Sequence, residues 1–309
     1  MMVNQNLRIV SLIPSATEIL AALGLKDAIV GRSHECDYPP EIKDRPVCTA
    51  ARLNSEAPSK EIHQNVNEIL QSALSIYQVK IDVLEQLKPT HIITQDQCDV
   101  CAVSLQDVEA AVGKLTQSQP KIISLQPNNL ADVWQDIERV ANALGVRSLK
   151  LLEDLEARVN ICQQKTSCLS LEELPTVACI EWTDPLMTAA NWIPELATKA
   201  GGQPLFSVSG QPSPILSWDT IVATNPDTIV FMLCGFDLHR TRQEAMTLTQ
   251  HSEWKNLHAV QHDRVYITDG NAYFNRPGPR LADSLEILAE ILHPEIFDYG
   301  YKGTGWELL

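Results

Sequence analysis

The sequence predicts an α/β protein with two lobes, each built around a parallel sheet, joined by a long helix. In both halves short β-rich runs alternate with helical patterns, which is typical of parallel sheets. One sequence pattern recurs once in each half, and the stretch between the halves is helical throughout. With 309 residues and 44% hydrophobic content, the chain can bury one large core or two smaller ones.

Four strands are expected in the first half, in the runs at 8–12, 28–31, 91–94 and 121–125. After the first run, Ser15 and Glu18 form a Ser-x-x-Glu capping box, so we expect a helix that begins at Ser15. A helix is predicted between the last two strands at 104–115. An extra helix is predicted within 59–78, where apolar residues recur at helical spacing.

The second half repeats this order of elements. Strands are expected at 176–181, 227–233 and 264–269, separated by helices near 192–200, 217–224 and 240–250. The recurring pattern is Asp, six residues, Pro, two residues, then Ile and a branched aliphatic residue. It begins at Asp82 and again at Asp219. A helix that is stopped by proline and leads directly into a strand fits both copies, which we interpret as an internal repeat.

The halves are joined by residues 129–165. Val133, Ile137, Val140 and Leu144 give a helical stripe that ends at Gly145, and good helix formers follow. We therefore predict an N-terminal Rossmann-like lobe at 1–128, linking helices at 129–170 and a C-terminal lobe at 171–309.

The charge balance excludes several partners. Net charge is −15, from 39 acidic against 24 basic residues, and no basic stripe occurs. Nucleic acid and anionic membrane surfaces both need clustered Lys and Arg, so neither is expected. No segment approaches the ~20 apolar residues of a membrane span. No signal peptide or early lipoprotein cysteine precedes Cys36, so the chain as written is expected in the cytoplasm, or in the periplasm if the true start lies upstream.

Cysteine and histidine side chains gather after two of the predicted strands. His34 and Cys36 follow one strand, and Cys98 and Cys101 follow what we expect to be its neighbour. These are zinc-ligand types, so a zinc or iron site is one hypothesis. Small buried thiols and direct ligand contact are the alternatives. Nearby Asp96 and Asp99 disfavour a redox pair.

The whole chain resembles the helical-backbone periplasmic binding proteins, the substrate-binding components of ABC transporters for cobalamin, haem and ferric siderophores. The resemblance rests on the repeat, on the linking helix, on the opening RIVSLIPSATEILAALGL with GRSHECDYPP, and on FNRPGPRLADSLEILAEILHP near the end. It is closest to the cobalamin-binding branch. The resemblance implies a ligand cleft between the two lobes and a bulky metal chelate, cobalamin among the candidates, as ligand, with no cofactor required.

A parallel sheet binds its ligands beyond the carboxyl ends of its strands. We therefore expect ligand contacts from loops at those ends, and large aromatic side chains suit a bulky, flat ligand. The expected ligand-binding residues are Pro14, Ser15, His34, Tyr38, Gln95, Trp182, Trp192, Phe236, Tyr273, Phe274 and Arg276. For Trp192 the alternative is packing against the helix that follows it, and for Arg276 it is capping of neighbouring strands.

The resemblance also implies a permease dimer as partner, met by one acidic residue at the repeat position of each lobe. Asp82 and Asp219 occupy those positions, with capping of their own helices as the alternative. The protein is otherwise expected to be a monomer. No nucleotide-binding or nucleophile motif occurs, so an enzyme is not expected. A thiol- or His-based metal enzyme and a cytosolic chelate carrier or sensor are the alternatives.

Overall fold

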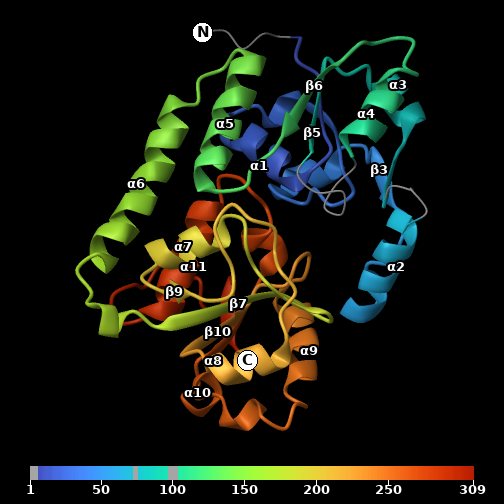
Figure 1. The fold of residues 1–309 in the computed structure, drawn as a ribbon. Coiled ribbons are helices and arrows are strands. Elements are labelled where there is room, and N and C mark those ends of the chain that lie inside the picture. Colours follow the sequence, from blue (N-terminus) through green and yellow to red (C-terminus); the bar gives the residue numbers. More distant parts are fainter. Residues whose placement is uncertain (1–5, 72–75, 97–103) are drawn as a thin grey trace. The chain divides into compact units, whose positions relative to one another are not determined.

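The computed structural model describes residues 6–71, 76–96 and 104–309 and divides into two compact units (Figure 1). Unit 1 comprises Met1–Ala57, Glu61–Pro127 and Ala131–Glu153. Unit 2 comprises Pro58–Lys60, Asn128–Leu130 and Asp154–Leu309. Each unit has its own sheet, as the alternation of strands and helices predicts, so the α/β fold class is confirmed.

The main sheet of unit 1 has four strands in the order β2-β1-β5-β6, and every pair is parallel. The strands are β1 (Ile9–Ser11), β2 (Ile29–Arg32), β5 (His91–Gln95) and β6 (Lys121–Leu125). A separate antiparallel pair is formed by β3 (Thr49–Ala51) and β4 (Tyr77–Val79). All four predicted strands are found. Because β1 lies between β2 and β5, the expectation that the strands preceding Cys36 and Cys98 are neighbours was wrong.

Helices of this part of the chain are α1 (Pro14–Ala22), α2 (Ser59–Gln71), α3 (Ile81–Leu87), α4 (Leu105–Val112) and α5 (Leu130–Leu144), with 3-10 turns η1 (Lys26–Ala28) and η2 (Pro40–Asp44). The buried apolar core of this unit includes the side chains of Val10, Leu84 and Ile92. Burial of these side chains is the main term that stabilises the unit.

The start of α1 differs from the prediction. Ile13 is the N-cap and its side chain makes no capping bond, while Pro14 occupies the first helical position. Proline is suited to that position because its fixed φ is helical and its missing N–H would have no partner there. Ser15 therefore lies inside the first turn, where its buried Oγ has no hydrogen-bond partner among the described residues, and the capping box with Glu18 does not form.

The sheet of unit 2 follows the order β12-β11-β10-β7-β8, and β9 pairs with β7. Its strands are β7 (Thr176–Thr183), β8 (Leu186–Thr188), β9 (Gln203–Pro204), β10 (Thr228–Phe231), β11 (Val265–Thr268) and β12 (Trp306–Leu308). The three predicted strands, β7, β10 and β11, are parallel to one another and form its centre. Strands β8 and β12 add antiparallel edges that the sequence pattern did not reveal.

Helices of unit 2 are α7 (Ile193–Lys199), α8 (Trp218–Thr224), α9 (Leu238–Leu248), α10 (His258–Gln261) and α11 (Leu281–Leu292), with the shorter turns η3 (Leu171–Glu173), η4 (Trp254–Asn256) and η5 (Gly270–Phe274). Every residue of α11 is buried except Asp283, which is partly exposed, so this helix is the central packing element of the unit. No helix in the described ranges is both long and apolar enough to cross a membrane.

The two copies of the repeat have the same structure. Helices α3 and α8 are seven residues each, with Asp82 and Asp219 in their first turns. Both end in a left-handed residue that is not glycine, Lys88 with φ 47° and Asn225 with φ 51°, immediately before the proline. Each then leads into a strand, β5 or β10, of its own sheet. The residue before a proline is disfavoured in the right-handed helical region, so the proline accounts for the sharp stop.

The link between the units is helical. Helix α5 ends before Gly145, whose φ of +71° lets the chain turn, and α6 (Leu149–Thr166) follows. The division between the units falls between Glu153 and Asp154, inside α6. The predicted long connecting helix is therefore confirmed, with a turn at Gly145 separating it from α5.

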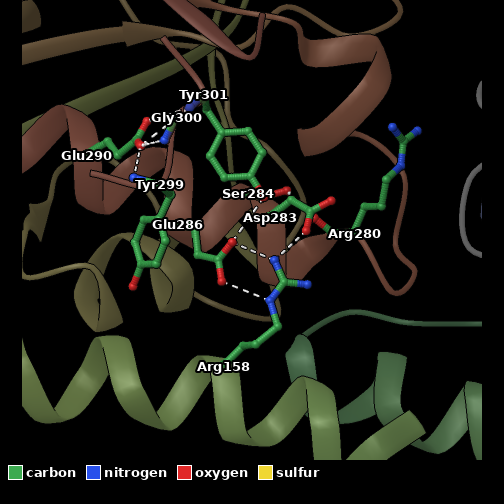
Figure 2. A network of polar contacts seen from close by, with 9 residues as sticks. All are labelled: Arg158, Arg280, Asp283, Ser284, Glu286, Glu290, Tyr299, Gly300 and Tyr301. Carbon is green, nitrogen blue, oxygen red and sulfur yellow. Dashed lines mark hydrogen bonds and ion pairs between the residues drawn. The ribbon is translucent and has the colours of Figure 1, made fainter. Parts of the chain in front are cut away.

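A network of polar contacts holds the C-terminal tail against helix α11 of unit 2 (Figure 2). The buried carboxylate of Glu290 on α11 accepts hydrogen bonds from the backbone N–H groups of Tyr299, Gly300 and Tyr301, and from the indole of Trp306. One and two turns earlier on α11, Glu286 and Asp283 pair with Arg158 of α6, and the Tyr301 hydroxyl donates to Glu286 over 3.0 Å. Burial raises the pKa of Tyr301, so this hydroxyl keeps its proton.

Candidate functional site

The carboxyl edge of the unit 1 sheet gathers five of the predicted ligand-binding residues. Pro14 and Ser15 follow β1, His34 and Tyr38 follow β2, and Gln95 ends β5. Parallel strands end at one edge of their sheet, which places these loops together. Tyr38 is 44% exposed, whereas Ser15 and Gln95 are buried. Of these five residues, Tyr38 offers the most accessible apolar surface.

His34 is held by a polar network at this edge. Its Nδ1 lies 2.7 Å from the Thr49 hydroxyl, which also accepts from the His34 backbone N–H and contacts the Ser33 hydroxyl at 3.1 Å. The Tyr77 ring packs at 5.4 Å, and its hydroxyl donates to Glu35. Burial, with the nearby charges of Lys80 and Arg32, lowers the pKa of His34. The imidazole is therefore neutral and fixed in orientation near pH 7.

Cys36 has the contacts of a packed core thiol. It is 1% exposed, and its sulfur accepts a hydrogen bond from the Thr17 hydroxyl at 3.0 Å. Cys98 and Cys101, the other two predicted metal-ligating cysteines, lie outside the described residues. Among the residues that are described, no group of three or more His, Cys, Asp or Glu side chains could hold a metal ion. The zinc or iron site at His34 and these cysteines stays a prediction.

In unit 2, the carboxyl ends of β7 and β10 bring two predicted aromatic residues together. The rings of Trp182 and Phe236 lie 5.4 Å apart, and the Arg240 guanidinium stacks 4.7 Å from the Phe236 ring. Trp182 is partly exposed and donates its indole N–H to the carbonyl of Asp184, while Phe236 is buried beneath it. Because β7 and β10 are adjacent and parallel, the two aromatic side chains form one apolar surface backed by a cation.

The segment after β11, the next strand, adds a second aromatic and cationic group. Asp269 accepts from the Ala272 N–H over 2.7 Å and starts the turn η5. Burial raises the pKa of Asp269. Beyond this turn, the Arg280 guanidinium lies 5.2 Å from the Tyr273 ring, which is half-buried.

Three other predicted residues of unit 2 are buried. Phe274 is completely inaccessible, and Trp192, 6% exposed, donates its indole N–H to the Phe274 carbonyl at 2.9 Å. Arg276 is 4% exposed and donates to Asn271. Phe274 and Trp192 therefore belong to the core of unit 2 and support the η5 turn that carries Tyr273. The burial of Trp192 agrees with its packing alternative.

Sequence reasoning missed three side chains at these edges. Thr17 and Thr49 complete the network around Cys36 and His34, and Arg240 completes the aromatic surface while pairing with Glu244 at 3.0 Å. The i,i+4 spacing of Arg240 and Glu244 was visible in the sequence. Nothing in the sequence indicated that Thr49 would meet a residue fifteen positions earlier.

Two curated relatives cover most of this chain. An "Uncharacterized ABC transporter substrate-binding lipoprotein" of Bacillus subtilis is 26% identical over 300 residues, which are 94% of this chain and 81% of that protein. A "Vitamin B12-binding protein" of Vibrio cholerae is 26% identical over 294 residues, which are 92% of this chain and 88% of that protein.

Solved structures show the same fold. The periplasmic vitamin B12 binding protein of Vibrio cholerae superposes with a TM-score of 0.63 at 22% identity, covering 92% of this chain and 96% of that one. A periplasmic heme binding protein of Pseudomonas aeruginosa gives a TM-score of 0.71 at 18% identity, covering 94% and 93%. Residues 9–272 match the family described as "Periplasmic binding protein", and the resemblance seen in the sequence is confirmed. The chain therefore belongs to the periplasmic binding protein family.

Proposed function

We propose that this protein binds a bulky metal chelate, with a corrinoid as the first candidate, for delivery to an ABC transporter. The observation that supports this most is the relative named as a vitamin B12-binding protein, which matches along 92% of this chain. Haem and ferric siderophores are the other candidates, since a structure of similar fold is named as a heme-binding protein.

The aromatic surface of unit 2 suits such a ligand. Trp182 presents a large, rigid, amphipathic ring that rests on Phe236, so little conformational entropy is lost when a flat macrocycle stacks on it. Arg240 and Arg280 place cations beside this surface and beside Tyr273. They could meet the phosphate of a corrinoid or the carboxylates of a haem.

From unit 1, we propose Tyr38 as an aromatic contact and His34 as a polar one. The Nδ1 of His34 is engaged by Thr49, and its lowered pKa favours a neutral ring whose Nε2 accepts a hydrogen bond from the ligand or approaches a metal centre. We propose that Ser15, whose buried Oγ has no partner in the part of the chain that the structure describes, bonds a polar group of the ligand. The cleft expected between the lobes stays a prediction.

The proposal that this protein docks to a permease rests on the internal repeat. Asp82 and Asp219 are exposed, and each stands at the same position of its own copy. Neither is the N-cap of its helix, since Lys80 and Ser217 occupy those positions, so hydrogen-bonded capping does not account for them. We propose that both carboxylates meet basic groups of a permease dimer, which fixes register and speeds association. Charge reversal at both should abolish association with the permease and leave ligand affinity unchanged. The cytoplasmic location expected from the first residues stays a prediction, and it is incompatible with this docking, which requires the outer side of the membrane.

The experiment is equilibrium binding of cyanocobalamin, haem and a ferric siderophore, followed by tryptophan fluorescence. We expect saturable binding of one chelate class at one site per chain. Trp182→Leu should weaken that binding about tenfold or more, as expected for a buried tryptophan contact. Trp218→Leu is the control, because the Trp218 ring stacks on His251 and Trp254, whereas the Trp182 ring packs on Phe236.

The proposal fails if none of the three chelates binds to the wild-type protein at about 100 μM, a weak limit for a transport protein. Binding that is unchanged in the Trp182→Leu variant would remove the aromatic surface from the site. Equal losses from both tryptophan variants would point to a general effect on unit 2.

A further inference from the structure

Two histidines lie at helical spacing just before β11, at the amino edge of the unit 2 sheet. His258 begins α10, and the His262 backbone N–H donates to the His258 carbonyl at 3.2 Å, so the helical turn is complete between them. Their rings are stacked with centroids 4.0 Å apart and an interplanar angle of 29°. Side chains at i and i+4 of a helix point the same way, which is the spacing at which two imidazoles chelate a metal ion once both rings turn their Nε2 atoms toward it.

Acceptor groups face the Nδ1 atom of each ring. The Nδ1 of His262 lies 2.9 Å from the His258 carbonyl. The buried Nδ1 of His258 makes no hydrogen bond to a described residue, but it lies 3.5 Å from a carboxylate oxygen of Asp227, close enough for electrostatic attraction. A carbonyl and a carboxylate only accept, so both neighbours favour the tautomer with hydrogen on Nδ1. The lone pair of each neutral ring is then on Nε2. Carboxylates and backbone carbonyls orient metal-ligating histidines in this manner.

Hydrogen bonds also fix the Asp227 carboxylate and the first residue of α10. Asp227 accepts from the backbone N–H and the hydroxyl of Thr176, at 2.8 and 2.7 Å. The His258 backbone N–H donates to the Asn225 side chain at 2.7 Å, which ties α10 to the end of α8. The pair therefore stands on a fixed frame within unit 2.

Both rings are open to a hydrated ion. The side chain of His258 is 41% exposed and His262 is exposed. Imidazole nitrogen suits Ni²⁺, Cu²⁺ and Zn²⁺, whereas Mg²⁺ and Ca²⁺ require oxygen ligands. As no third described His, Cys, Asp or Glu completes a cluster here, water would fill the remaining coordination positions.

We propose that His258 and His262 form a two-imidazole site for a divalent transition-metal ion, Ni²⁺, Cu²⁺ or Zn²⁺. It lies at the opposite end of β11 from Tyr273 and the chelate-binding surface, and it does not depend on the proposed function. His258 is oriented by Asp227, a positioning residue, and both imidazoles bind through Nε2.

The test is calorimetric titration of Ni²⁺ into the full chain, without an affinity tag and with a non-coordinating reductant that keeps thiols reduced. We expect a saturable event at one ion per chain that weakens at least tenfold in His262→Ala and in His258→Gln. His251→Ala is the matched control, because His251 is exposed in the same unit and has no histidine three or four residues away. It should bind Ni²⁺ like the wild type.

Three results would overturn the site: no saturable event in the wild type, unchanged binding in the His258→Gln/His262→Ala double variant, or an equal loss in His251→Ala. Asp227→Asn gives a further readout, since loss of the negative charge behind His258 should weaken Ni²⁺ binding several-fold without abolishing it. Thermal melting without metal checks that each variant is folded, and His262, an exposed residue after the helix, is the variant least able to disturb folding.

Discussion

Replacement of Glu290 by glutamine tests how the C-terminal tail is fastened (Figure 2). In the wild type, one carboxylate oxygen accepts from the N–H groups of Tyr299 and Gly300, and the other from Tyr301 at 3.2 Å and the Trp306 indole at 2.8 Å. A glutamine keeps one oxygen and turns an NH₂ group toward the remaining pair of donors. Two hydrogen bonds are lost, and donors then face donors.

The size of the loss in stability depends on which pair of N–H donors loses its acceptor. Trp306 is buried, so an unbonded indole N–H would carry the full cost of desolvation, whereas Tyr299 and Gly300 lie near the surface. The glutamine oxygen should therefore keep Trp306 and Tyr301, and water should reach part of the other pair. We expect a loss of about 2 to 3 kcal/mol in the free energy of unfolding of unit 2. That corresponds to a fall of about 4–12 °C in its melting temperature.

The assay combines thermal melting with amide hydrogen exchange. Exchange should quicken at residues 299–301 and in β12, whose Trp306–Leu308 backbone pairs with β11, and should stay slow in β7 and β10. Glu156→Gln is the control, because Glu156 is an exposed glutamate on α6 in the same unit. A Glu290→Gln variant that melts within about 1 °C of this control, with unchanged exchange in the tail, would refute the reasoning.

Two further predictions concern the stability of the fold, one from a glycine substitution and one from the protonation of His91. Gly270→Ala should lower the melting temperature of unit 2 by several degrees, because the added Cβ would clash with the Leu233 carbonyl, whereas Gly113→Ala meets nothing closer than 3.5 Å and should be neutral. Burial, with the charge of Lys121, lowers the pKa of His91 in the folded state, so the unfolded chain binds more protons. Stability should then rise with pH up to about 6.5, and His91→Gln should flatten that slope in urea titrations.

The sequence was most informative where local chemistry decides the backbone. The proline stops of the repeat, at Pro89 and Pro226, predicted two helix ends and the strands that follow them, and the structure has both. It was less informative at α1, where Pro14 competes with Ser15 for the helix start. Both residues suit a helix N-terminus, and the fixed φ of proline decided the outcome.

The edge strands β8, β9 and β12 escaped prediction because each has only two or three residues, too few for a period to show. The order of strands also cannot be taken from local pattern. Strand β1 separates β2 from β5, and this placement depends on contacts between residues about twenty and eighty positions apart. The predicted grouping of the cysteines depended on that order.

For the candidate site, the sequence predicted which loops lie at the strand ends more reliably than it predicted which side chains are exposed there. Trp182 and Phe236 meet because adjacent parallel strands end side by side, which is a rule of topology. Tyr273 and Phe274 are adjacent in the sequence, and the turn that contains both decides which of them faces inward. In η5, the chain turns so that Tyr273 is half-exposed and Phe274 is buried, and Trp192 fixes that turn by its bond to the Phe274 carbonyl.

Strand β11 separates the two proposed sites of unit 2. The histidine pair precedes it and Tyr273 follows it, so the four residues of β11, at ~3.3 Å each, put about 13 Å between them. Side chains at that distance without shared partners act additively. Metal at His262 and a chelate at Trp182 should therefore bind independently, and a Trp182→Leu/His262→Ala double variant should show the two single losses unchanged. A chelate affinity that shifts when Ni²⁺ is added would mean that β11 transmits a structural change from one edge of the sheet to the other.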